Sequence, residues 1–209
     1  MKIVLFTVAA LLASLSPVRA QEPPAPHDHA GHGAPAAPQP EVAPSPAQGY
    51  FGDTLLFDQD GREVRFYSDL IRGKIVIMDF IFTRCAGPCP ILSATFAKIQ
   101  KHLGDRLGKD VFLVSFSVDP DYDTPARLKE YAERFNARPG WSFITGSREN
   151  MEIALTRLGQ WVEEPDNHQV LYILGNEHTG LWKKAFGLSK PEELFPIVDS
   201  VIDDPGEGE

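Results

Sequence analysis

Cysteine and positive charge are both scarce in this chain. It has two cysteines in 209 residues, and 20 Lys and Arg against 29 Asp and Glu give a net charge of −9. The negative charge argues against nucleic acid and against an anionic membrane surface as partners. No internal repeat is present, and residues 49–205 have the length of one domain. The two cysteines, Cys85 and Cys89, lie four positions apart, which favours a chemical site over a staple between distant segments.

The first twenty residues resemble a secretory signal. Lys2 precedes an apolar stretch at 3–15, and Ala20 ends the segment with the small residue that a signal peptidase accepts. The apolar stretch is short of the roughly 20 residues that cross a membrane comfortably, and an uncleaved anchor is the alternative. We therefore expect a periplasmic protein whose membrane contact is limited to a partner or an uncleaved signal. In that compartment dithiols tend to be oxidised unless something keeps them reduced.

Residues 21–48 are rich in Pro and Ala and lack apolar periodicity. Such a segment buries too little surface to offset its ordering entropy, so we predict a disordered tether. It contains His27, His29 and His32, which fit either a solubilising linker or a weak metal-gathering arm. Residues 206–209 form an acidic tail.

The remaining chain alternates between strand and helix patterns. Short alternating runs around Asp60-Gly61 predict a hairpin, and nearly continuous apolar runs predict buried strands at 74–82 and 110–119. Further strands are expected at 141–146, 169–175 and 180–187, with helices from the cysteines to Gly104 and at 124–135, 147–159 and 191–202, the last interrupted by Pro196. Right-handed crossovers between such elements give a central mixed sheet flanked by helices. With a cysteine pair opening a helix and a terminal ββα unit, the pattern predicts an α/β, thioredoxin-like fold with an N-terminal β-hairpin.

The cysteine pair occupies the end of the first buried strand. Pro90 suits the first turn of a helix, and the unpaired N–H groups of that turn favour thiolate over thiol, with Arg84 as a further positive charge. Three uses fit the pair. A structural disulfide would close a very short loop and gain little. Reversible thiol–disulfide exchange and soft-metal binding are the other two.

A metal would need a further ligand, and His168 is the candidate because it precedes the penultimate strand, whose entry faces the cysteine loop in a thioredoxin-like fold. A solvated loop histidine is the alternative; His102 and His178 are expected at the surface.

The cluster Asp119, Asp121 and Asp123 lacks the glycine and glutamate of an EF-hand. It is typical of a strand exit and helix start, although Asp119 could border the cysteine site.

The segments "FIFTRCAGPCP", "SFSVDPDYDTPARLKEYAERF", "WSFITG" and "NHQVLYIL" follow one another as in the Sco/SenC copper-chaperone family, which the chain resembles over residues 49–203. The resemblance implies a thioredoxin-like domain that binds copper, as Cu(I), Cu(II) or both, through Cys85, Cys89 and His168. The family often has proline where Ala86 stands. It commonly flanks its histidine with Asp and Ser, where this chain has Asn167 and Gln169.

The resemblance also implies a role and partners. The family helps to assemble the dinuclear copper centre of cytochrome c oxidase, so the expected acceptor is an oxidase subunit, with a periplasmic copper donor and a thioredoxin-like reductant as further partners. This describes a metallochaperone rather than an enzyme. The alternative is a thiol–disulfide oxidoreductase that reduces cysteines of periplasmic targets and needs Cys85 and Cys89 but not His168. A peroxidase is a weaker third possibility, since no further resolving cysteine is present.

Overall fold

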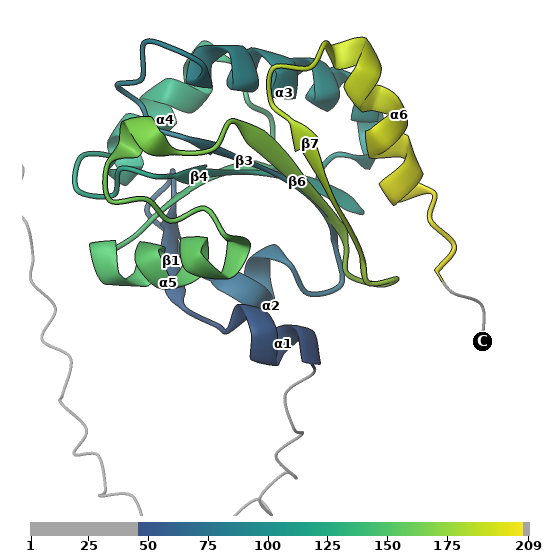
Figure 1. The fold of residues 1–209 in the computed structure, drawn as a ribbon, viewed down its shortest axis with the longest axis horizontal. Helices are drawn as coiled ribbons and strands as arrows, with labels where there is room; N and C mark the ends of the chain where they lie inside the picture. The colour runs from purple at the N-terminus through teal and green to yellow at the C-terminus, as the bar shows by residue number, and fades with distance from the viewer. Residues whose placement is uncertain (1–45, 207–209) are drawn as a thin grey trace, which may run out of the picture. The chain divides into compact units, whose positions relative to one another are not determined.

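The computed structural model describes residues 46–206 (Figure 1). The predictions of a signal peptide, of the tether up to residue 45 and of the end of the acidic tail lie outside these residues, as do His27, His29 and His32. The described elements are, in chain order, α1 (Pro46–Phe51), β1 (Leu55–Asp58), β2 (Glu63–Arg65), α2 (Phe66–Leu70), β3 (Ile75–Ile81), α3 (Cys89–Leu103), η1 (Gly104–Arg106), β4 (Val111–Ser117), α4 (Pro125–Arg134), β5 (Trp141–Thr145), α5 (Arg148–Leu158), η2 (Pro165–Asn167), β6 (Leu171–Asn176), β7 (Leu181–Phe186) and α6 (Pro191–Ile202).

The strands form one mixed sheet in the order β2-β1-β5-β4-β3-β6-β7. Strands β3, β4 and β5 are parallel, whereas β6 pairs with β3, and β1 with β5, in antiparallel fashion. All seven residues of β3 are buried, because helices cover both faces of the sheet at its centre. The predicted thioredoxin-like fold with a mixed sheet and an N-terminal hairpin is confirmed.

The helices divide into two layers. Helices α3, α4 and α6 cover one face, and α5 covers the other together with α1 and α2 (Figure 1). The chain advances in one direction from β3 to β4 to β5, so right-handed crossovers place α3 and α4 on the same face. A hydrogen bond between the Ser93 and Tyr131 hydroxyls connects these two helices, and the Arg138 N–H, in the loop after α4, donates to the Gln100 side chain of α3.

Most predicted helix boundaries agree with the structure. Thr124 caps α4, accepting from the Arg127 N–H, and Gly104 ends α3 with φ of 56°. The predicted interruption at Pro196 is wrong, since α6 continues through this residue. Pro196 removes one helical N–H, but it lies on the exposed side of the helix, where water can reach the carbonyl that is left without a partner.

Two short helices were not predicted. Helix α1 begins three residues before the expected start of the domain at 49, and α2 follows the hairpin directly. None of the helices within residues 46–206 has both the length and the apolar character of a membrane span.

Candidate functional site

The site lies where the carboxyl ends of β3 and β4 meet the entry to β6. Strand β6 runs antiparallel to β3, and Met78 pairs with Ile173, so the residues just before β6 lie beside the residues just after β3. Open α/β sheets place their binding sites at such carboxyl ends. The topology thereby brings residues 82–89 and 165–170 to one edge of the sheet, although about 80 positions separate them in sequence.

Cys89 is the first residue of α3 and is completely buried, whereas Cys85 lies half-buried in the preceding loop. Both are free thiols. Burial raises the pKa of the Cys89 thiol above its ordinary value, and the Cys85 side chain raises it further. The helix start was expected to favour the Cys89 thiolate. Desolvation outweighs that effect, because the thiolate would be a charge without water around it.

His168 is oriented by its own loop. The short helix η2 ends at Asn167, and the His168 Nδ1 atom lies 2.7 Å from the Pro165 carbonyl oxygen. A carbonyl oxygen can only accept, so Nδ1 carries the proton and Nε2 presents its lone pair. That Nε2 atom lies 3.8 Å from the Cys89 Sγ.

The imidazole is also shielded from water. His168 is 7% exposed, and the Phe82 ring packs against it edge-to-face with centroids 5.7 Å apart. Burial lowers the pKa of His168, so the ring is neutral at pH 7. A neutral ring with a fixed Nδ1–H and a free Nε2 is the form that binds metal.

The predicted site residues are therefore only partly assembled. Cys89 and His168 are in contact, and Cys85 is four residues away on the same loop. Among residues 46–206, no group of three or more His, Cys, Asp or Glu side chains is already arranged around a common point. A soft metal bound by all three side chains would therefore require them to close around it.

The Asp cluster borders the site as expected for Asp119 and holds the cysteine loop in place. Asp123, which is buried, accepts hydrogen bonds from the N–H and hydroxyl of Thr83 and from the Ser117 hydroxyl at 2.7 Å. Asp119 accepts from the Arg84 Nε at 2.7 Å. The positive charge of Arg84 thus pairs with a carboxylate. From the sequence, this charge was instead expected to favour the thiolate form of the cysteines.

Asp121 takes no part in the site and pairs instead with Arg148. His178 is exposed at the β6–β7 turn, and His102 is exposed on α3, where it bonds Asp199. Both histidines lie at the surface as predicted.

Asp79 is a residue that sequence reasoning missed. It lies in the middle of β3, is completely buried, and its carboxylate oxygens have no hydrogen-bond partner in the described part of the chain. Burial raises its pKa to about 7, opposed by an interaction with Ser115, the residue paired with it on β4. Its charge also contributes to the raised pKa of Cys89. The one acidic letter in the apolar run "IVIMDFIF" was the available signal.

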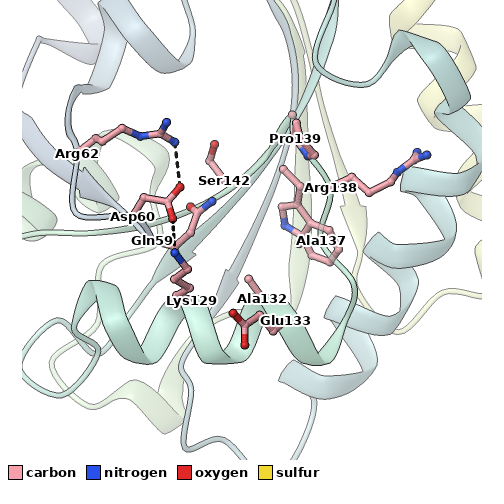
Figure 2. A pocket seen from close by; sticks show the side chains of 12 residues that line it. Gln59, Asp60, Arg62, Lys129, Ala132, Glu133, Ala137, Arg138, Pro139 and Ser142 are labelled. Carbon is pink, nitrogen blue, oxygen red and sulfur yellow. Dashed lines mark hydrogen bonds and ion pairs between the residues drawn. The ribbon is translucent and has the colours of Figure 1, made fainter. Parts of the chain in front are cut away.

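A separate cavity of about 440 Å³ lies between the β1–β2 turn and α4 (Figure 2). Asp60 forms ion pairs with both Arg62 and Lys129 in its lining. It is lined by neither cysteine nor histidine, so it does not contribute to the predicted chemistry.

Comparison with known proteins agrees with the fold. The SCO1/SenC family matches residues 43–181. The SCO1 protein homolog of Bacillus subtilis is 36% identical over 119 residues, which cover 55% of this chain and 60% of that protein. The SCO2-like protein of Rickettsia conorii is 34% identical over 159 residues, 70% of this chain and 74% of the relative.

Solved structures give the same result. A SCO1/SenC family lipoprotein from Bacillus anthracis aligns with a TM-score of 0.62 at 30% identity, over 72% of this chain and 94% of that one. Copper-bound ScoI from Arabidopsis thaliana aligns with a TM-score of 0.62 at 26% identity, over 73% and 98%. With residues 43–181 matched by the family and a relative 34% identical over 70% of its length, the chain belongs to the SCO1/SenC family.

Proposed function

We propose that this protein is a copper-binding metallochaperone that holds copper with Cys85, Cys89 and His168. The observation that carries the proposal is the buried, unprotonated His168 Nε2 atom 3.8 Å from the Cys89 Sγ. Two thiolates and one imidazole form a donor set that suits Cu(I), and the imidazole also makes Cu(II) tolerable. Copper bound in the related ScoI structure from Arabidopsis thaliana supports this assignment.

Copper binding requires the two thiols to lose their protons, because thiolates are the ligands. The raised pKa of Cys89 keeps this thiol protonated in the metal-free protein, so loading releases protons. Oxidation to a disulfide would remove both sulfur ligands and prevent loading. The related protein BsSco, a member of the Sco family of cytochrome c oxidase assembly proteins, has a disulfide switch.

The proposed acceptor is the oxidase subunit that carries the dinuclear copper site, and copper would pass to it by exchange of thiolate and imidazole ligands. A periplasmic donor would load the protein, and a thioredoxin-like reductant would keep its thiols reduced. Residues 1–20 would direct the chain to the periplasm, and 21–48 would tether the copper-binding domain, 49–205. The lipoprotein nature of the B. anthracis relative supports a location outside the cytoplasm.

Competition for Cu(I) against a chromophoric chelator tests the ligand set. We expect His168→Ala to weaken Cu(I) binding by at least tenfold, in the range reported for losing one metal-site interaction. His102→Ala is the matched control, since it removes an exposed histidine from α3 and should leave affinity unchanged. Equal affinities for wild type and His168→Ala would remove His168 from the site.

Thiol–disulfide exchange is the second candidate, favoured by the two free cysteines on one loop. In this reaction both thiols give up two electrons and two protons to a target disulfide, which becomes a dithiol while Cys85 and Cys89 join. It does not need an imidazole ligand. Two results together would favour this function. His168→Ala would reduce a model disulfide at the wild-type rate, and neither the variant nor the wild type would bind copper.

A further inference from the structure

Three arginines surround a small hollow directly beside the cysteine loop. Arg84, Arg127 and Arg134 line this hollow of about 140 Å³ together with Thr83, Tyr122 and Glu130. The guanidinium of Arg127 lies 3.9 Å from the centroid of the Tyr122 ring, and that of Arg84 lies 5.0 Å from the same ring. Stacking on an aromatic face holds an arginine in place while leaving donors at its edge free.

The arginine cluster has more positive charge than its surroundings neutralise. Arg84 pairs with Asp119, and Glu130 is the one acidic residue in the lining, so three arginines face two carboxylates. Arg127 and Arg134 are exposed on α4. In a chain with a net charge of −9, a hollow lined by three arginines and one glutamate beside the proposed metal ligands is a local reversal of sign.

Apolar side chains lie on the opposite side of the cysteine loop. Phe186 and Leu188, at the end of β7, are 83% and 62% exposed. A Cβ atom on Gly187 would lie 2.4 Å from Leu92 of α3, so this turn packs against the helix that Cys89 begins. Ile91, in the first turn of the same helix, is 54% exposed.

The two groups flank the route by which copper would leave. The sheet order is β4-β3-β6-β7, with the arginines on the β4 side of the loop and Phe186 and Leu188 on the β7 side. Cys89 and His168 are buried, whereas Cys85 is half-buried on the loop between Arg84 and the start of α3. A protein that takes copper from this site must therefore approach Cys85 across this surface.

We propose that Arg84, Arg127, Arg134, Ile91, Phe186 and Leu188 form a docking face for the copper-accepting protein, and that the accepting surface carries carboxylates next to its own copper ligands. This inference depends on the proposed function. Apolar contacts with arginine at the edge are the composition that protein interfaces favour. Opposite charges speed encounter and fix the orientation, while the apolar contacts set the lifetime of the complex.

The test compares charge reversals on two faces. Arg127→Glu with Arg134→Glu changes the proposed docking face, and Arg72→Glu with Arg157→Glu makes the same change in net charge at exposed residues elsewhere. The probe is the reduced, copper-free oxidase subunit of the same organism. Binding of this subunit to each immobilised variant, measured at several salt concentrations, gives the association and dissociation rates of the complex. Chelator competition gives the Cu(I) affinity of each variant alone.

We expect the docking-face pair to slow association at least tenfold at low salt and to remove most of its salt dependence, with Cu(I) affinity unchanged. Phe186→Ser should instead speed dissociation. Equal association rates for the two double variants, or no binding of the wild type, would overturn the proposal. So would binding to phosphatidylglycerol vesicles that only the docking-face pair abolishes. Absence of Cu(I) binding by the wild type would instead contradict the proposed function. Failure of the docking face and failure of the copper-binding function are therefore distinguishable.

Discussion

Replacing Asp79 by Asn should change how the stability of this protein depends on pH. Asp79 is fully buried in β3 without a hydrogen-bond partner for its carboxylate within residues 46–206, and its pKa rises to about 7 from the ordinary 3.8. The folded protein therefore holds a proton that the unfolded chain releases. Stability from this group is complete below pH 3.8 and is lost as the pH rises through 7.

The size of the effect follows from the shift in pKa. A rise from 3.8 to about 7 corresponds to about 4 kcal/mol in total, because one pKa unit is worth about 1.4 kcal/mol. About 3 kcal/mol of this should be lost between pH 5 and pH 8. Asparagine has nearly the same shape but does not ionise, so Asp79→Asn should lack this part of the pH dependence.

Urea unfolding of the reduced, metal-free protein at pH 5 and pH 8 measures the effect for wild type and variant. The free energy of unfolding of Asp79→Asn minus that of the wild type should be about 3 kcal/mol larger at pH 8 than at pH 5. Asp69→Asn, an exposed carboxylate on α2, is the control for the loss of one negative charge. Parallel pH dependences for wild type and Asp79→Asn would refute the reasoning.

Further predictions concern the cysteine loop and its histidine. Asp123→Ala should lower the free energy of unfolding by about 3 kcal/mol, because three donors on Thr83 and Ser117 lose their acceptor; a loss below about 1 kcal/mol in urea would contradict this. The oxidised protein, with Cys85 joined to Cys89, should take no Cu(I) from a chelator, and copper binding after oxidation would argue against the sulfur ligands. Because burial lowers the pKa of His168 below 6.5, stability of the metal-free protein should fall as the pH drops through 6.5 and below, and His168→Ala should remove this acid loss in thermal unfolding.

The sequence was sufficient for the order and type of the main elements. Nearly continuous apolar runs predicted β3 and β4, and the helix expected from the cysteines to Gly104 is α3, which begins at Cys89 and has Gly104 at its end. Helices α1 and α2 were not predicted because each has only six or five residues. Packing of Phe51 and Phe66 against each other stabilises them, and such tertiary contacts leave no local periodicity.

The sequence indicated candidate residues for the site but not their protonation or burial. The cysteine spacing and the family resemblance indicated Cys85, Cys89 and His168, and the fold brings the last two into contact. The raised pKa of Cys89 depends on complete burial, which no local pattern reveals. The bonds of Asp123 to Thr83 likewise join residues 40 positions apart, so only the fold shows that the aspartates secure the cysteine loop.

X-ray absorption at the copper edge of the reduced, Cu(I)-loaded protein tests the central claim most directly. The proposed ligands predict two sulfur neighbours at about 2.2 to 2.3 Å and one nitrogen neighbour, by analogy with thiolate and imidazole distances in other soft-metal sites. The nitrogen should disappear in His168→Ala and persist in His102→Ala. A wild-type spectrum with sulfur neighbours only, or one that His168→Ala leaves unchanged, would contradict a copper site built from both cysteines and this histidine.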